Sequence, residues 1–402
     1  MSTLAHSPRT VPRIRVDCVS TDRDFLELQS EWNPLLMQTQ RPVPFLTWEW
    51  VSTWWKHFAA NSKLFILVAR TETGDLVGIA PLHIVIRRAF GLVPVRTVEF
   101  LGYHGSAVCS DHLDLLVPPP DQEIVCAGLL EAMMARKQEW DCVAFGDVVE
   151  GSVLFGCMSE LAKRWDLTLQ PGPQEFCPYL HLPERWDDLL RSMRQRRRSM
   201  VTNRRHRRER LAQEFQVHFD LECSPSKVPQ QLASLERLHG LAQNRKGEAG
   251  HFKIDKYRKF HRDVAERMAL AGHLYMARFD CNGTAVASGY GFFLGRRLFY
   301  YQSGFDPAWS PHGVSAILLA YIMEDAIERL GATEFDFLRG QENYKYFWTD
   351  VNRKTEGLFL WGRSPRARVA EAEFTVRRRL SRVRMQFEKW TAIIKKKLQS
   401  NA

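Results

Sequence analysis

The sequence predicts a mixed α/β protein made of two halves of similar design, followed by a basic helix. Two observations support this fold class. Runs with strand character alternate with runs of helical spacing throughout the 402 residues. In addition, residues 67–82 (LVARTETGDLVGIAPL) resemble residues 275–291 (YMARFDCNGTAVASGYG) when one inserted residue is allowed. Each segment precedes a strand, a helix and a further strand, so a duplicated α/β unit is the favoured interpretation.

The first half begins after an N-terminal tail with an aromatic-rich helical region at 32–58, interrupted by Pro42 and Pro44. A turn at Gly74-Asp75 separates two β-rich runs and predicts a hairpin. The expected strands are Leu64–Arg70, Leu76–Ile86, Val93–Leu101, His112–Val117 and Asp141–Phe145, and the expected helices are Ile124–Lys137 and Val153–Trp165. Prolines at 171, 173, 178 and 183 then punctuate the chain, so we place a domain boundary near 175–185.

The second half opens with a helical arm at 186–215, and Asn282-Gly283 predicts a second hairpin. The expected helices are 232–243, 256–271, 313–330 and 344–350, and the expected strands are 274–279, 285–294, 298–304, 335–338 and 357–362. These boundaries divide the chain into a first domain at 1–180, a second at 181–364 that includes the arm, and a C-terminal helix at 365–402.

The net charge of +10 is concentrated in two segments. Residues 191–210 hold ten Arg and one Glu, and residues 363–402 hold twelve Lys or Arg and three Glu, so the rest of the chain is net acidic. This distribution disfavours a uniformly basic nucleic-acid-binding protein. Arg191–Arg210 is either a solvated helix face or a contact for an anionic ligand or membrane surface. The terminal helix carries an apolar stripe, which suits docking onto the body or lying on an anionic membrane.

Several site classes lack their sequence signals. The eight Cys form no CxxC pair, so we expect structural thiols. No apolar run is long enough to span a membrane and no secretory signal is visible, so we expect a cytoplasmic protein, either free or peripheral at the inner face of the membrane. His104, Asp111, His112 and Asp114 lack tight metal-ligand spacing, so we expect no metal; they line either a cleft between the domains or a polar loop. The Trp-rich block at 48–55 packs in a core or stacks on a ring.

Residues 298–348 are the most informative for function. A strand ends at Ser303, and a loop through Ser310 and His312 leads to a helix that starts at Gly313, followed by Val314 and Ser315. The free N–H groups and dipole of a helix N-terminus suit a pyrophosphate, and glycine allows close approach. An ordinary helix start is the alternative.

A second block follows the buried strand at 335–338. Asp336, Arg339, Glu342 and Lys345 are ionisable residues clustered where that strand ends, and ligand sites gather at strand ends in open α/β sheets. A carboxylate beside Lys or Arg can deprotonate an acceptor or stabilise an oxyanion. A structural network of salt bridges is the alternative.

These residues carry a family resemblance. The basic arm, "SGFDPAW", "SPHGVSAILLAYIMEDA" and "FDFLRGQENYKYFW" resemble the acyltransferase domain of the CelD/BcsL type in the GNAT superfamily, and "PFLTWEWVSTWW" and "LGYHGSAVCSDHLDLLV" resemble its front half. The resemblance covers nearly the whole chain. The wider clan includes FemAB-like aminoacyl transferases, which also have two tandem GNAT folds. It therefore implies two tandem GNAT-like domains, and it allows the first, on the acceptor side, to be degenerate.

The resemblance also implies roles for residues. Ser310 to Ser315 align with the Gln/Arg-x-x-Gly-x-Gly/Ala loop that binds the acyl-CoA pyrophosphate, although Ser stands at the first position. The strand to Ser303 would hold the thioester carbonyl. Tyr344 or Tyr346 would protonate the leaving thiolate, Lys345 would stabilise negative charge, and Asp336 would be general base or acceptor anchor. The expected acceptor-binding residues are Arg339, Glu342, Tyr346, His104 and Asp111.

Three functions follow as hypotheses. The first is an acetyl-CoA-dependent acyltransferase that modifies an amine or hydroxyl of a small molecule or saccharide, in exopolysaccharide, cellulose-related or other cell-envelope metabolism. The second is a FemAB-like transferase whose basic arm holds aminoacyl-tRNA, the one case in which a nucleic acid is expected. The third is a non-catalytic basic module that binds membrane or nucleic acid.

Overall fold

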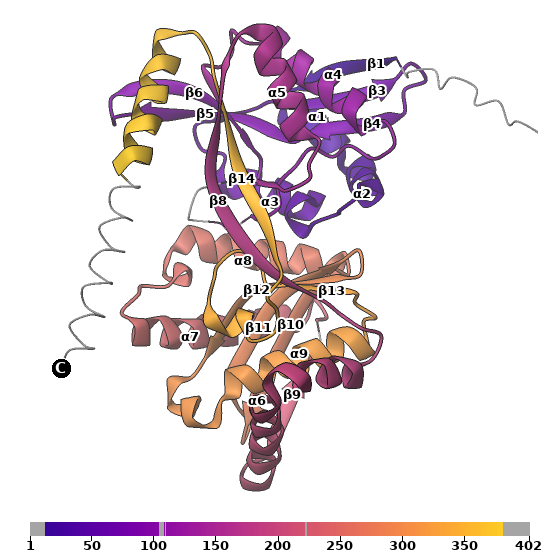
Figure 1. The fold of residues 1–402 in the computed structure, drawn as a ribbon, viewed down its shortest axis with the longest axis vertical. Coiled ribbons are helices and arrows are strands. Elements are labelled where there is room, and N and C mark those ends of the chain that lie inside the picture. Colours follow the sequence, from indigo (N-terminus) through magenta and orange to yellow (C-terminus); the bar gives the residue numbers. More distant parts are fainter. Residues whose placement is uncertain (1–12, 104–107, 109, 222, 381–402) are drawn as a thin grey trace, which may run out of the picture.

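A computed structural model describes residues 13–103, 108, 110–221 and 223–380, and shows two α/β halves stacked along the long axis (Figure 1). The first half contains β1 (Ile14–Val19), α1 (Asp22–Glu27), α2 (Gln29–Gln38), the 3-10 helix η1 (Pro44–Leu46), α3 (Trp48–Phe58), β2 (Ser62–Leu64), β3 (Ile66–Thr71), β4 (Leu76–Ala80), β5 (Leu82–Ala89), β6 (Val93–Phe100), α4 (Gln122–Ala135), β7 (Cys142–Val149), α5 (Leu154–Trp165) and β8 (Thr168–His181).

The second half contains α6 (Trp186–Glu214), β9 (Val217–Asp220), α7 (Val228–Lys246), the 3-10 helix η2 (His251–Lys253), α8 (Asp255–Leu270), β10 (Leu274–Cys281), β11 (Thr284–Leu294), β12 (Arg297–Phe305), the 3-10 helix η3 (Pro307–His312), α9 (Val314–Glu328), β13 (Glu334–Asp336), α10 (Asn343–Tyr346) and β14 (Asn352–Trp361). The final described helix spans 365–380, and the rest of the predicted terminal helix lies outside the described residues.

The two halves repeat one arrangement, which confirms the mixed α/β class. In the first half α4 connects the parallel neighbours β6 and β7, and in the second half α9 connects the parallel neighbours β12 and β13. Both predicted hairpins are present, as β3–β4 and as β10–β11. At the second hairpin Asn282 and Gly283 have φ of 48° and 73°, which a two-residue primed turn requires.

One sheet runs through both halves. Among the described residues its eleven strands follow the order β2-β5-β6-β7-β14-β8-β13-β12-β11-β10-β9, and β1-β3-β4 form a smaller sheet. The long strands β8 and β14 lie side by side and pass from one half to the other (Figure 1). β8 reaches β13 of the second half, and β14 returns to pair with β7 of the first half. Each half therefore receives a strand from the other.

The prediction that prolines 171, 173 and 178 only punctuate the chain is wrong, because all three lie within β8. Proline lacks the N–H that a strand between two neighbours needs. Residues 168–178 of β8 pair with β14 alone, and β13 joins only from Tyr179 onward, so the prolines occupy the part of the strand with one partner. Pro171 also stands opposite Leu358, where the register with β14 shifts.

The predicted strand at His112–Val117 is also wrong. Only isolated bridges occur there, Leu113 to Val148 and Leu116 to Ile79. The segment belongs instead to a long connection from β6 to α4, whose described residues cross toward the second half.

Aromatic side chains of the first half join the two halves. Trp32, Trp48, Trp50 and Trp54 are fully buried, so the Trp-rich block packs in the core. The Trp50 ring contacts Phe45 of its own half and Phe260 and Phe292 of the second, with centroids 4.9, 5.1 and 5.6 Å apart. This interlocking fixes the position of one half against the other.

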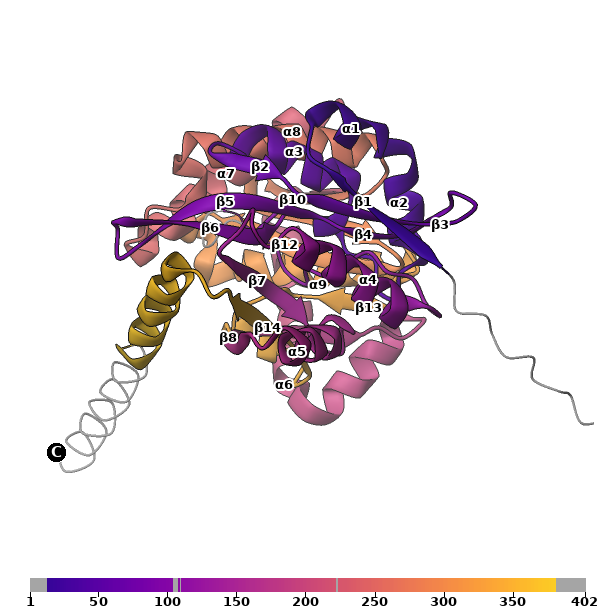
Figure 2. The same ribbon diagram turned by 90° about the horizontal axis from the view of Figure 1, so that it is seen from above.

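The described part of the C-terminal helix docks onto the body. Seen from above, it lies beside the β5–β6 end of the sheet (Figure 2). Phe374 packs against Phe359 and Trp361 of β14, with ring centroids 4.4 and 5.5 Å apart. No helix in the described part of the chain is both long and apolar enough to cross a membrane.

Candidate active site between the two halves

β12 and β13 diverge at the centre of the second half. Their parallel pairing covers only Arg297 to Phe299 of β12, opposite Glu334 to Asp336 of β13. β12 continues to Phe305, whereas the chain turns away from the sheet after Asp336. On the side that faces away from β11, residues 300–305 of β12 therefore have no strand paired with them in the described structure. Ser303 lies on this stretch, opposite Gly289 of β11.

The loop after β12 brings two arginines to the start of α9. Gly313 has φ of 71°, a left-handed conformation that favours glycine, and precedes the first helical residue, Val314. A side-chain carbon at position 313 would lie 2.9 Å from Nη1 of Arg207 on α6. Nη1 of Arg245 on α7 donates to Ser310 Oγ at 2.6 Å. The helix N-terminus and two guanidinium groups thus form an electropositive corner, with Ser315 exposed in the first turn of α9.

Rings complete the same loop. His312 contacts Phe215, at the end of α6, and Trp309, with centroids 5.6 and 5.4 Å apart. The basic helix α6 is thus packed against the loop and against α9, where its Leu189, Met193 and Leu211 are buried.

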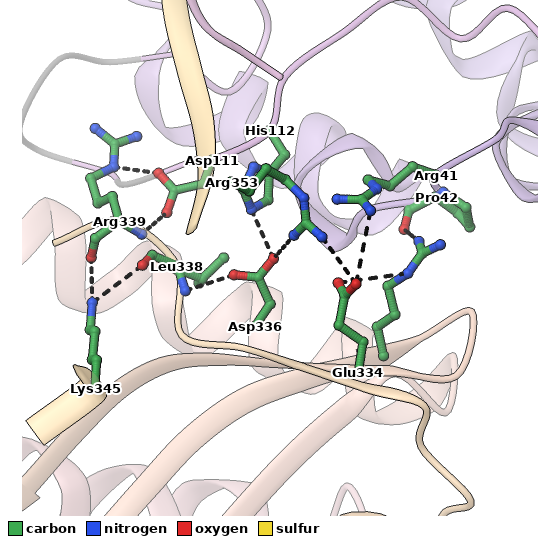
Figure 3. Close-up of polar contacts among 11 residues, drawn as sticks. Arg41, Pro42, Asp111, His112, Glu334, Asp336, Leu338, Arg339, Lys345 and Arg353 are labelled. Carbon is green, nitrogen blue, oxygen red and sulfur yellow. Dashed lines mark hydrogen bonds and ion pairs between the residues drawn. The ribbon is translucent and has the colours of Figure 1, made fainter. Parts of the chain in front are cut away.

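Asp336 is the centre of a buried network (Figure 3). Its Oδ1 accepts from the Leu338 backbone N–H at 2.8 Å, and its Oδ2 contacts His112 Nε2 at 3.0 Å and Arg353 Nη1 at 2.5 Å. Arg353 also donates to Glu334 at 3.0 Å. His112 comes from the first half and is fully buried, with its Nδ1 lacking a hydrogen-bond partner among the described residues. Burial opposes charge on its imidazole, but the Asp336 carboxylate outweighs burial and raises the pKa of His112.

Arg339 makes a second link between the halves. Its backbone N–H donates to Asp111 Oδ2 at 2.9 Å, its guanidinium pairs with the same carboxylate, and it reaches Asp147 Oδ2 at 2.8 Å. Burial raises the pKa of Asp147 to about 6 despite Arg339. The predicted acceptor residues Asp111 and Arg339 are therefore in direct contact, while His104 lies outside the described residues.

Lys345 fixes the turn that carries Arg339. Its buried Nζ donates to the carbonyl oxygens of Leu338, Arg339 and Gly340 at 3.3, 2.6 and 3.3 Å, and lies 2.9 Å from Glu342. The neighbouring tyrosines differ in setting. Tyr344 is exposed, with its ring edge toward Phe337, and Tyr346 donates to Asn352 Oδ1 at 2.9 Å.

Three residues that contact Asp336 or Arg339 have a strained backbone conformation. His112, Asp147 and Leu338 have φ of 60°, 56° and 57°, values that cost free energy for residues other than glycine. Each of the three contributes a contact to the Asp336 or Arg339 networks. Strained residues held by their surroundings are typical of functional sites.

A polar cavity of about 460 Å³ adjoins His112. Its lining comes from both halves and includes Arg41, His112 and Asp114 from the first and Arg297 and Arg353 from the second. Such a volume suits a small molecule. No group of His, Cys, Asp and Glu that could hold a metal occurs among the described residues.

The sequence did not indicate Arg353, Glu334 or Arg245 as parts of the site, and it indicated Arg207 only as a member of the basic segment Arg191–Arg210. Arg353 is the second residue of β14, and the exchange of strands brings it to Asp336. Arg207 lies within a uniformly basic run, so its neighbours in sequence do not distinguish it. For His112 and Asp114 the sequence left two interpretations, the lining of a cleft between the domains or a polar loop, and the structure places both in the lining of the cavity.

Comparisons with known proteins agree with this geometry. Residues 194–346 match the family model described as the acetyltransferase (GNAT) domain. The sequence matches no curated protein. Solved structures with a similar fold include FemX, at 11% identity and TM-score 0.56, with 83% of this chain and 95% of that chain covered.

Two other solved structures are similar. One is a conserved protein of unknown function from Bacteroides thetaiotaomicron, at 11% identity and TM-score 0.52, covering 86% of this chain and all of that chain. Another is a tandem GNAT protein from the clavulanic acid biosynthesis pathway, at 12% identity and TM-score 0.43, covering 88% of this chain and 100% of that one. Residues 194–346 are therefore similar to a GNAT acetyltransferase domain, and the overall fold is similar to that of FemX.

Proposed function

We propose that the protein transfers an acetyl or other acyl group from acyl-CoA to an amine or hydroxyl. The observation that carries this proposal is the divergence of β12 from β13 beside the glycine-led N-terminus of α9. An extended thioester chain can lie along the unpaired edge of residues 300–305 and hydrogen-bond to its backbone. CoA supplies the activated acyl group as a thioester.

The residues present fit the phosphates of CoA. Gly313 keeps the approach to the helix N-terminus free of a side chain, and Arg207 and Arg245 place positive charge beside it. We assign Ser310, His312, Gly313, Val314 and Ser315 to this donor loop and Ser303 to the strand edge. Phosphate oxygens would accept from backbone N–H groups and from both guanidinium groups.

We propose that Asp336 acts through His112. In this mechanism Asp336 accepts from His112 Nε2–H and orients the ring, so that Nδ1 can take the proton lost by the acceptor as its nitrogen or oxygen bonds to the acyl carbon. The carbon–sulfur bond then breaks, and Tyr344 donates its hydroxyl proton to the leaving sulfur. Lys345 is a positioning residue that holds the 338–340 turn.

The acceptor follows from the family resemblance. We propose a small molecule or saccharide, from exopolysaccharide, cellulose-related or other cell-envelope metabolism of the CelD/BcsL type. Arg339, Glu342, Tyr346 and Asp111 would lie near it. The protein would act in the cytoplasm or at the inner face of the membrane.

A second candidate donor is aminoacyl-tRNA. The observation that favours it is the contact of α6 with the donor loop through Arg207, which would place the basic arm beside the reacting ester. Titration with deacylated tRNA separates the two donors, because tRNA affinity falls steeply with salt whereas acyl-CoA makes far fewer phosphate contacts.

The donor loop can be tested by calorimetric titration of acetyl-CoA into wild type, Gly313→Trp and Gly331→Trp. Both glycines have positive φ and lie at opposite ends of α9, so the two variants carry a similar backbone cost. Position 331 opens onto free space, whereas position 313 faces Arg207. We expect Gly313→Trp to weaken binding by about a hundredfold or more, because the indole fills the phosphate position.

Gly331→Trp should bind acetyl-CoA as the wild type does. Equal affinities in all three proteins would refute the assignment of the loop. Absence of acetyl-CoA binding to the wild type, together with tight tRNA binding, would move the donor to aminoacyl-tRNA.

A further inference from the structure

The polar cavity beside His112 holds an excess of positive charge at the boundary with the second half. Arg41, Arg297 and Arg353 converge on two carboxylates, Glu334 and Asp336 (Figure 3). Three guanidinium groups share two carboxylates there, so the positive charge is incompletely paired, although Arg297 also donates to the Pro42 carbonyl oxygen at 3.5 Å. Desolvated charge is costly unless it is paired.

The contacts show which arginines are poorly paired. Arg353 is fully engaged, at 2.5 Å from Asp336 and 3.0 Å from Glu334, and its guanidinium lies over the Tyr179 ring. Arg41 and Arg297 each approach Glu334 only to 3.8 Å. Arg41 Nη1 is buried and has no hydrogen-bond partner among the described residues.

Arg41 and Arg297 also oppose each other. Burial and the nearby Arg41 both lower the pKa of Arg297, which shows that the pair is held at a cost. An anionic group between them would remove the repulsion and accept from the free Arg41 nitrogen. A charge-assisted hydrogen bond of this kind is among the strongest that proteins make.

The first-half side of the same cavity has the opposite character. Asp114 lines it and is half-buried, accepting from the Leu115 backbone N–H and from Ser152 Oγ, both at 2.8 Å. Exposed Glu150, two residues before Ser152, also lines the cavity. His112 lines the same cavity two residues before Asp114, and its Nδ1 has no hydrogen-bond partner among the described residues. These acceptor atoms suit an amine or hydroxyl.

We propose that this cavity binds a small acceptor with an anionic group and an amine or hydroxyl: Arg41 and Arg297 hold its carboxylate or phosphate, and its nucleophile lies beside His112 and Asp114. The assignment of the bound molecule as the acceptor rests on the proposed transferase, whereas the anion site itself does not. The substrate class is therefore an amino acid, a hydroxy acid or a phosphorylated amino sugar or sugar.

The anion site can be tested with malonate and inorganic phosphate as probes. Calorimetric titration at constant ionic strength compares the wild type with Arg41→Gln and with Arg88→Gln, an exposed arginine on the β5 end far from the cavity lining. Arg41 is partly exposed, so its replacement should preserve the fold. We expect Arg41→Gln to weaken malonate binding by about tenfold or more and Arg88→Gln to leave it unchanged.

One further variant, Arg245→Gln, and an acetyl-CoA titration of Arg41→Gln locate the anion and separate this inference from the transferase. Arg245→Gln removes a donor-loop arginine and should weaken acetyl-CoA but not malonate, and Arg41→Gln should bind acetyl-CoA normally. Phosphate at the cavity should follow malonate, whereas phosphate at the donor loop should respond to Arg245→Gln.

Unchanged malonate binding in Arg41→Gln, its loss in Arg245→Gln alone, or no binding of either anion to the wild type would overturn the cavity site. Loss of malonate binding in Arg41→Gln with no acetyl-CoA binding to any protein would leave the anion site in place and defeat the acyl-CoA-dependent transferase.

Discussion

At the scale of single residues, buried carboxylates mark the boundary between the halves. Burial raises the pKa of Asp114 to about 6 from its usual 3.8, although the Ser152 hydroxyl and the Leu115 N–H favour the ionised form. Ionised Asp114 therefore destabilises the folded state at neutral pH. Side chains kept at such a cost are common where they serve a ligand.

Replacing Asp114 with Asn should stabilise the protein at pH 7. The folded pKa lies above the unfolded value, so the wild type gains stability from Asp114 protonation below about pH 4 and loses it as the pH rises to 6. The variant escapes this loss and should be more stable by about 1–3 kcal/mol at pH 7, with the advantage vanishing near pH 4. Urea unfolding at pH 4, 5, 6 and 7 measures the difference.

Asp187→Asn, at an exposed position in the first turn of α6, is the control and should change stability by less than about 0.5 kcal/mol. A difference between Asp114→Asn and wild type that is the same at pH 4 and pH 7 would contradict the account of Asp114.

The sequence could indicate several residues of the candidate site, but not which of them contact one another. The run from Asp336 to Lys345 was visible as an ionisable cluster, and Asp111 as a polar loop residue. The bond from His112 to Asp336 joins positions 224 residues apart, and no local pattern encodes such a pairing. Its geometry depends on the β6–α4 connection crossing to the other half, which follows from packing of both halves together.

At the scale of elements, helices were easier to predict than strands. The spacing of apolar residues in 124–137 and 313–330 matches α4 and α9 because a buried helix face repeats every three to four residues. β8 was not predicted, because proline is rare in a strand that has a neighbour on each side, and its three prolines were therefore interpreted as a loop. Only the pairing with β14 alone makes them compatible with a strand.

The docked C-terminal helix should contribute to stability through the side chain of Phe374. Phe374→Ala removes the packing on Phe359 and Trp361 and should cost about 1–3 kcal/mol in the free energy of unfolding by urea. Val376 on the same helix is 44% exposed, so Val376→Ala should cost less than about 0.5 kcal/mol. Equal small effects would show that this helix is not docked in solution.

At the scale of the whole molecule, the exchanged strands make the two halves one folding unit. β14 lies between β7 and β8, and β8 continues to β13, so neither half completes its sheet without the other. The boundary near 181 that the sequence suggests divides the chain in sequence, whereas the hydrogen-bonded sheet continues across it.

A substitution that creates a cavity in the core of the second half should therefore also destabilise the first half. Ile322 is fully buried in α9, and Ile322→Ala should lower global stability by about 2–5 kcal/mol. Peptide-resolved hydrogen exchange should show faster exchange in β6 of the first half as well as in β12. Leu270→Ala, at a side chain that is 75% exposed, should accelerate neither. Acceleration confined to the second half would mean that the halves unfold independently.

The position of β14 has a consequence for how the chain is made. The strand that pairs with β7 on its open side ends at Trp361, so an emerging polypeptide cannot complete the first-half part of the large sheet until residue 361 has left the ribosome. Until then β7 exposes an unpaired edge, a surface prone to pairing with other chains. Contacts this distant in sequence also form slowly. The newly synthesised protein should thus depend on chaperones until β14 has paired with β7.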